Sequence, residues 1–217
     1  MKRDIVIPYK LSKSGELEYA IKSCKNLKHG RIIVVGDKPE LEVEHAKPFI
    51  VRWVMLSAHH DVINKLSYII GTKLTDEFIL MNDDFFVMQP TDLRTYHRGT
   101  LANHIASRRL NDNYTKTLVK TYDYLKSIGI EEPLSYELHT PMVLNKHKLR
   151  EMYEAIVPLI SHSSVMLTRS LYGNIYKIGG DFMDDVKNPT VPIGMMFISS
   201  SDATFKGELG EYIRSNL

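Results

Sequence analysis

An amide and two carboxylates, Asn82, Asp83 and Asp84, interrupt an otherwise apolar stretch of the chain. Apolar residues occupy positions 78–81 before them and 85–88 after them. Burying an ionised carboxylate without a partner is costly, so these acids must either lie at the exposed end of a strand or hold a cation. Mg²⁺ and Mn²⁺ bind a few carboxylate oxygens together with substrate phosphates. A solvated β-turn, which Asn-Asp sequences also favour, is the alternative.

Glu137 and His139 form a second pair of chemically active side chains, in the segment SYELHTPMVL. One residue separates them, so in an extended segment they point the same way, and Pro141 disfavours a helix at Thr140. A carboxylate beside an imidazole can perform general acid and base chemistry or complete a metal shell. A hydrogen-bonded pair that stabilises a bend is the competing interpretation.

A third group of acids, Asp181, Asp184 and Asp185, follows two glycines in GGDFMDDVKN. Paired acids in a loop could bind acceptor hydroxyls, and Asp185 could act as a base instead of Glu137. A solvated loop is the alternative.

Cations accompany these acids in two places. Lys10 and Lys38 lie beside expected strand ends, where they would neutralise phosphate, although surface lysines also serve solubility. Asp61 and Lys65 are spaced i,i+4 on the polar face of an expected helix, 61–74. They could form an ordinary surface ion pair worth tenths of a kcal/mol, or Lys65 could contact a sugar or phosphate.

The segment 94–120 is basic, with six Lys or Arg against one acid, Asp112. Tyr96 and Tyr114 lie among these charges, a mixture compatible with following a phosphate backbone and stacking a base. The net charge of the whole chain is only +2, too small to indicate a nucleic-acid binder by itself. The alternative is that the cations serve a phosphorylated substrate or solubility.

The elements that must position these groups alternate in type. Apolar runs predict strands over 4–8, 31–37, 77–83 and 85–90, and helical periodicity predicts helices over 17–27, with Ser14 as a cap and Gly30 past the stop, and over 61–74. This order favours a mostly parallel mixed sheet with helices on both faces, an α/β fold. Ligands bind beyond the carboxyl ends of such strands, which places residues 8–10, 36–38 and 82–84 along one rim.

The second half is less regular. We expect helices over 114–129, 147–160 with an end or kink near Pro158, and 168–178, and a last strand within 194–202. A chain of 217 residues with no linker is expected to form one domain.

The rest of the sequence excludes several classes of protein and of binding site. A single cysteine, Cys24, excludes an internal disulfide and a Cys-rich zinc site, and its place in an apolar stripe predicts a core thiol. No apolar run is long enough to span a membrane, and no signal-like start is present, so we expect an intracellular, cytoplasmic protein. Walker, Rossmann glycine, nucleophile-elbow and zincin motifs are absent from the sequence.

The strand that leads to Asn82-Asp83-Asp84 resembles the Asp-x-Asp motif of glycosyltransferases with the GT-A fold, which is Rossmann-like. NDDFF, with NKLSYII before it and ELHTPMVL and SSSDATF after it, is similar to the Stealth-type sugar-phosphate transferases. The resemblance touches most of the chain and implies a divalent cation, Mn²⁺ or Mg²⁺, and a nucleotide-diphosphate sugar as donor. Because Asn82 stands at the first position of the motif, Asp84 is implied as the direct metal ligand.

The resemblance also implies roles along the rim. Pro8, Tyr9 and Lys10 would meet the nucleotide and Asp37 would lie near its base. Lys65, Asn82 and Asp83 would complete the donor site within a half spanning 1–92. An acceptor half, 93–217, would supply Glu137 as the base candidate and His139 as an acceptor or metal candidate, with His162 as its rival for the metal.

The expected function is therefore a metal-dependent glycosyltransferase that moves a sugar to a hydroxyl acceptor. The basic segment 94–120 makes a hydroxymethylated base in DNA one candidate acceptor, as phage enzymes use, in which case the protein would act in the host cytoplasm. Two alternatives stay open: a Stealth-like sugar-phosphate transferase or a transferase acting on a cell-surface glycan, and a non-catalytic module that binds nucleotides or polyanions.

Overall fold

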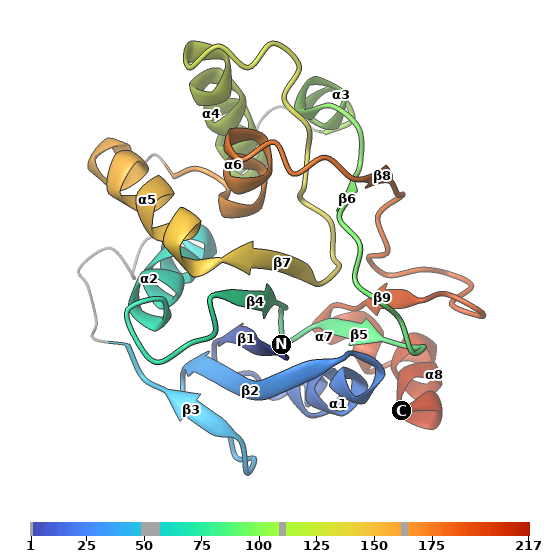
Figure 1. Ribbon diagram of the computed structural model, residues 1–217. Coiled ribbons are helices and arrows are strands. Elements are labelled where there is room, and N and C mark those ends of the chain that lie inside the picture. Colours follow the sequence, from blue (N-terminus) through green and yellow to red (C-terminus); the bar gives the residue numbers. More distant parts are fainter. Residues whose placement is uncertain (1, 49–56, 109–111, 162–164) are drawn as a thin grey trace.

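A computed structural model describes residues 2–48, 57–108, 112–161 and 165–217. Its main sheet has five strands in the order β3-β2-β1-β4-β7 (Figure 1). The strands are β1 (Arg3–Tyr9), β2 (His29–Gly36), β3 (Glu44–Ala46), β4 (Glu77–Leu80) and β7 (Met142–Asn145). The first four run parallel and β7 runs antiparallel to β4. The predicted α/β fold with a mostly parallel mixed sheet is confirmed.

Two small sheets lie beside the main one. β5 (Phe85–Val87) pairs antiparallel with β9 (Phe197–Ser199), and β6 (Tyr96–His97) pairs parallel with β8 (Asp181–Phe182). The predicted strand after the acidic triplet therefore exists, but it leaves the main sheet. A turn closed by the Phe85 amide donating to the Asn82 carbonyl at 3.3 Å redirects the chain there.

Helices cover both faces of the main sheet (Figure 1). They are α1 (Glu16–Ser23), α2 (Ala58–Ile69), α3 (Leu101–Ala106), α4 (Asn113–Ser127), α5 (Lys146–Ile156), α6 (Thr168–Ile175), α7 (Asp202–Phe205) and α8 (Glu208–Asn216), with 3₁₀ turns η1 (Cys24–Asn26) and η2 (Val157–Leu159). α5 ends just before Pro158, as predicted.

Two details of the first helix differ from expectation. Gly15, with φ of 79°, takes the N-cap position instead of Ser14, because a left-handed residue there turns the chain into α1. Gly30 lies inside β2 and does not end the helix. A Cβ on Gly30 would come 2.7 Å from the Asp4 carboxylate, so the strand needs glycine at this contact.

The core has two layers, one on each face of the sheet. Alternate residues of β1 point to opposite faces, so Val6 packs with the α2, α4, α5 and α6 side while Ile5 and Ile7 pack with the α1 and α8 side. Cys24 is fully buried in the second layer, as predicted, and burial raises the pKa of its thiol to about 12. Among the described residues, none of the helices has the length and hydropathy needed to cross a membrane.

Candidate active site at the carboxyl edge of the sheet

A buried lysine ties α2 to the end of β1. Lys65 Nζ lies 2.7 Å from the Tyr9 carbonyl oxygen and 2.5 Å from Asp61 Oδ2. The expected ion pair at i,i+4 is present, but it is not a surface pair, since the Lys65 side chain is only 7% exposed. Gly36 makes room for it, because a Cβ there would lie 2.5 Å from Lys65 Cε. Lys65 therefore braces the rim on which the donor residues were predicted.

The other predicted donor residues do lie along this rim. Tyr9 is buried, and its hydroxyl accepts a hydrogen bond from the Ser12 amide at 3.2 Å. Asp37 Oδ2 accepts from the Leu11 amide at 2.8 Å, which joins the loops after β1 and β2. Pro8 is buried within β1, and Lys10 is exposed just beyond it.

The acidic triplet forms the turn between β4 and β5, and a lysine from far along the chain meets it. Lys187 Nζ lies 2.5 Å from Asp84 Oδ2 and also donates to the Ser200 carbonyl. Asp84 Oδ1 is buried without a hydrogen-bond partner among the described residues. Burial, and next the neighbouring Asp84 carboxylate, raise the pKa of Asp83 to about 7. The cost of placing acids between apolar runs is thus met partly by Lys187 and partly by protonation of Asp83.

These residues suit a divalent cation that keeps substrate phosphates in its shell. The unpartnered Asp84 Oδ1 is a free carboxylate oxygen, and Mg²⁺ or Mn²⁺ needs only one or two such ligands from the protein. No cluster of three or more His, Cys, Asp or Glu side chains in the described part of the chain could hold a metal alone. His162, the predicted histidine ligand, lies outside the described residues.

His139 and Asp185 meet at the same edge, because β7 is antiparallel and the segment before it approaches the carboxyl end of β4. Asp185 Oδ1 and Oδ2 lie 2.8 and 2.9 Å from His139 Nδ1. Burial would raise the pKa of Asp185, but the hydrogen bonds from His139 outweigh it and the pKa is lowered. Since a carboxylate can only accept, Nδ1 carries the proton and Nε2 is left as the basic nitrogen.

Glu137 is held separately. Its Oε1 accepts hydrogen bonds from the amide and hydroxyl of Ser170, at 3.0 and 2.9 Å. Glu137 and His139 therefore do not pair with each other. Instead each is oriented by a partner more than thirty residues later in the chain, Ser170 or Asp185.

A cavity of about 430 Å³ brings these side chains together. It is lined by Asn82, Glu137, His139 and Asp185 from the predicted set, and by the cations Arg98, Arg108, Arg169 and Lys187. Asp181 is exposed, and its nearest cation is Arg94, 3.9 Å away. The third acidic group thus contributes Asp185 to the site and leaves Asp181 on the surface.

Sequence reasoning missed Lys187, Ser170 and Arg169. No motif marks them, and each reaches the site through a contact with a residue remote in sequence. Arg98 and Arg108 were recognised only as part of the basic segment 94–120. That segment does not present all its charge outward, because Arg98, Arg108 and Tyr114 line the cavity.

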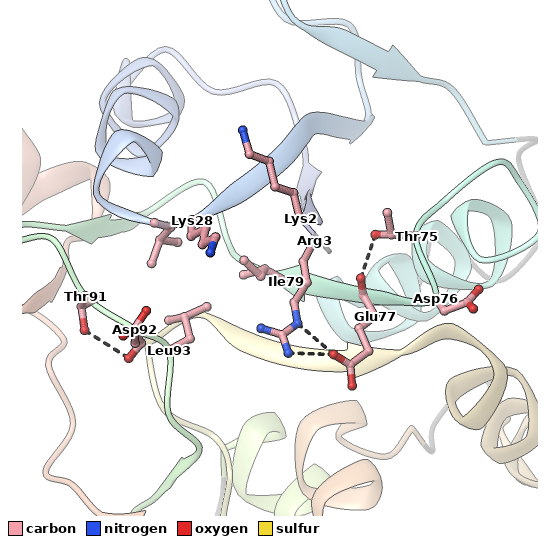
Figure 2. Close-up of a pocket in the computed structure, with 11 residues that line it drawn as sticks. Lys2, Arg3, Lys28, Thr75, Asp76, Glu77, Ile79, Thr91, Asp92 and Leu93 are labelled. Carbon is pink, nitrogen blue, oxygen red and sulfur yellow. Dashed lines mark hydrogen bonds and ion pairs between the residues drawn. The ribbon is translucent and has the colours of Figure 1, made fainter.

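A second cavity, of about 460 Å³, lies at the opposite, amino edge of the sheet (Figure 2). Arg3 projects into it and forms an ion pair with Glu77 at 2.7 Å, while Thr75 Oγ1 donates to the Glu77 carbonyl oxygen. None of the predicted site residues lines this cavity. The chemistry therefore gathers at the carboxyl edge, as expected for parallel strands.

Solved structures with a similar chain arrangement include an active-site mutant of LgtC, with a TM-score of 0.45 and 14% identity over 83% of this chain and 72% of that one. The apo form of the glycosyltransferase GlyE from Streptococcus pneumoniae TIGR4 gives a TM-score of 0.42 and 13% identity, over 99% of this chain and 51% of that one. A second GlyE structure from the same organism gives a TM-score of 0.35 and 14% identity, over 85% of this chain and 45% of that one. The chain thus spans about half the length of GlyE. No family model and no curated protein matches the chain.

Proposed function

We propose that the protein is a glycosyltransferase that moves a sugar from a nucleotide-diphosphate sugar to a hydroxyl acceptor. The observation that carries the proposal is the His139–Asp185 pair, which lines a cavity at the same edge of the sheet as Asp84. A histidine whose Nδ1 is held by a carboxylate is suited to accept a proton at Nε2.

The donor would lie across the ends of β1, β2 and β4. Asp37 and Lys10 stand at the nucleotide end, and Asn82, Asp83 and Asp84 at the diphosphate end. A divalent cation, Mg²⁺ or Mn²⁺, would be held by Asp84 with Asp83 beside it, and would supply positive charge to the diphosphate. Lys65 supports this edge indirectly, since its ammonium is already bound by Tyr9 and Asp61.

The chain's own groups would then carry the proton and the charge. The acceptor oxygen bonds to the anomeric carbon and gives its proton to His139 Nε2, while the bond between that carbon and the diphosphate breaks and the electron pair leaves with the diphosphate. Asp185 keeps His139 in the required tautomer and stabilises its cationic form. Lys187 and Arg98, both in the cavity wall, lie where they can offset the developing negative charge.

Glu137 remains a competing base, because it lines the same cavity. Its hydrogen bonds from Ser170 hold the carboxylate in a fixed orientation. We assign it to binding an acceptor hydroxyl. Comparing the Glu137→Gln and His139→Gln variants decides between the two bases, since loss of the true base lowers kcat by roughly a hundredfold or more.

The test of the proposed function is a screen of nucleotide-sugars for hydrolysis and transfer with Mn²⁺, in which wild type is compared with Asp84→Asn and His139→Gln. We expect turnover by the wild type and its loss in both variants, each shown to be folded by circular dichroism. Release of a nucleoside diphosphate indicates sugar transfer, and release of a monophosphate indicates transfer of a sugar phosphate. If no donor is bound or hydrolysed, the proposal fails.

The acceptor is examined in the same assay. Duplex DNA with hydroxymethylated bases is one arm, and glycans and small sugars are the others. Salt-sensitive transfer to the DNA would support the basic segment 94–120 as a DNA contact. Indifference to DNA would leave its cavity-lining cations to a smaller acceptor.

A further inference from the structure

Arg169 is a buried cation with no carboxylate at ion-pair distance among the described residues. It lies in α6, and only 8% of the residue is exposed. Nη1 donates to the carbonyl oxygens of Leu138 and Thr140, at 3.3 and 2.7 Å. Nη2 is buried and has no hydrogen-bond partner, and no ion pair joins Arg169 to another described residue. Burial lowers the pKa of Arg169, but a guanidinium stays charged at any physiological pH.

A buried guanidinium with an unpartnered N–H group is unfavourable unless a ligand accepts a hydrogen bond from it. A buried charge and a buried N–H donor both cost free energy when they lack partners. The carboxylates that face Arg169 electrostatically are Glu137, Asp84 and Asp185. Glu137 is bound by the neutral Ser170, Asp84 Oδ2 by Lys187 and Asp185 by His139, and none of the three forms an ion pair with Arg169. An anion that entered the cavity would supply what Arg169 lacks.

Positive charge also predominates in the rest of the cavity wall. Four cationic side chains line the cavity, against two carboxylates, Glu137 and Asp185. Arg98 faces Asp185 at 3.5 Å, and Arg108 faces the half-exposed Asp112 at 3.6 Å. His104 is also buried in this wall, with Nδ1 on Ser135 and no partner for Nε2 among the described residues.

Resting on the proposed function, we propose that this cavity binds an anionic group, a phosphate or a carboxylate, carried by the sugar that accepts the transfer, with Arg169 as its principal ligand. A guanidinium donates two parallel hydrogen bonds to such groups. The cavity of about 430 Å³ lies in the range of pockets that enclose a small ligand.

The place of Arg169 favours the acceptor over the donor diphosphate. The donor edge is formed by β1 and β2, whereas α3, α4 and α6 lie on the far side of β7 from those strands (Figure 1). Arg169 comes from α6, and His104 and Tyr114 come from α3 and α4. Glu137 and His139 stand in the segment between, just before β7. An anion on Arg169 would hold the acceptor so that its hydroxyl faces those two residues.

The test measures binding without donor and without metal, so it does not depend on turnover. Glucose 6-phosphate, glucuronate and glucose are titrated into the protein by calorimetry. We expect the two anionic sugars to bind at least about tenfold more tightly than glucose. Arg169→Gln should remove that preference. Arg3→Gln is the matched control, because Arg3 lines the other cavity and already has Glu77 as its partner (Figure 2).

Three results would overturn the proposal. One is equal binding of glucose and the anionic sugars. Another is an unchanged preference in a folded Arg169→Gln protein. The third is evidence that the anion site belongs to the donor. Such evidence would be displacement of glucose 6-phosphate by uridine or guanosine diphosphate. It would equally be an Arg169-dependent preference for a nucleotide-linked hexuronate over a nucleotide-linked hexose. If Arg169→Gln does not fold, Arg108→Gln on the exposed side of the wall must weaken the same preference.

Discussion

Both carboxylate oxygens of Asp185 lie within hydrogen-bond distance of one nitrogen of His139, at 2.8 and 2.9 Å from Nδ1. The Asp185 carboxylate also accepts from the His139 amide at 3.2 Å. Backbone and ring are therefore fixed by one side chain, which comes from a loop 46 residues later. This contact determines which nitrogen of His139 is free to act as a base.

We expect Asp185→Asn to lower turnover by about 10²- to 10⁴-fold, because an amide can donate to Nδ1 and place the proton on Nε2. Steady-state kinetics of nucleotide-sugar turnover measure the effect. Asp181→Asn, an exposed acid in the preceding strand β8, should retain wild-type rates. Equal rates for the two variants would remove His139 as the base.

Lys187 should compete with a metal ion for Asp84, since its ammonium lies 2.5 Å from Oδ2. Lys187→Met should therefore tighten Mn²⁺ binding by roughly tenfold, the scale of one charge-assisted hydrogen bond. Electron paramagnetic resonance of free Mn²⁺ gives the affinity. Lys206→Met, an exposed lysine, should leave it unchanged, and weaker binding in Lys187→Met would contradict the competition.

Asp4 should be among the costliest acids to remove. Its carboxylate accepts from the Arg31 amide at 3.0 Å, from Arg31 Nη2 at 2.6 Å and from the Thr75 amide at 3.3 Å. We expect Asp4→Ala to lower the free energy of unfolding by about 2 kcal/mol, because three hydrogen bonds to one buried carboxylate are lost, one of them charge-assisted. Urea denaturation measures it. Asp76→Ala, whose contacts are exposed, should lower it by clearly less.

His104 should make the fold sensitive to mild acid. Burial, then the charges of Arg98 and Arg108, lower its pKa from 6.5 to about 4. Between pH 6.5 and about pH 4 the unfolded chain binds the His104 proton more readily than the folded protein does. The contribution of neutral His104 to stability is therefore present above pH 6.5 and is lost as the pH falls towards 4. At most this is worth roughly 3 kcal/mol.

The measurement for His104 is the difference between wild type and His104→Gln, by urea denaturation from pH 7 to pH 4. Taking the difference matters, because Asp83 has the opposite sign over much of the same range: its raised pKa favours the folded state at lower pH. The advantage of wild type over the variant should shrink as the pH falls. A constant difference would show that His104 does not titrate in this way.

The parts of the fold that were predictable have local causes. β1, β2 and β4 are apolar runs of strand length, and the triplet 82–84 marks where β4 ends, so the rim could be placed from sequence. The partner of β5 could not be predicted. Phe85–Val87 is an apolar run that would suit the main sheet as well as the small sheet with β9, and the turn at Asn82 directs it to β9.

The candidate site was also predicted only in part, because some of its residues stand out by type while others reach it through contacts remote in sequence. Glu137, His139 and Asp185 are conspicuous as residue types, and all three line one cavity. Their partners are not conspicuous, since Lys187 meets Asp84 across 103 positions and Arg169 looks like one more polar residue on a helix. Lys65 was expected at the surface because it stands opposite an apolar stripe. It is buried because Gly36 leaves space for its side chain at the rim.

The late position of Lys187 and Ser200 has a consequence for the newly made protein. The residues of β1, β2, β4 and β7 all precede Asp185 and Lys187 in the chain, so they leave the ribosome first and the main sheet can begin to form before those two residues emerge. Asp84 is then present without Lys187, and His139 without Asp185. The nascent chain can therefore reach its architecture before Asp84 and His139 gain the partners that hold them.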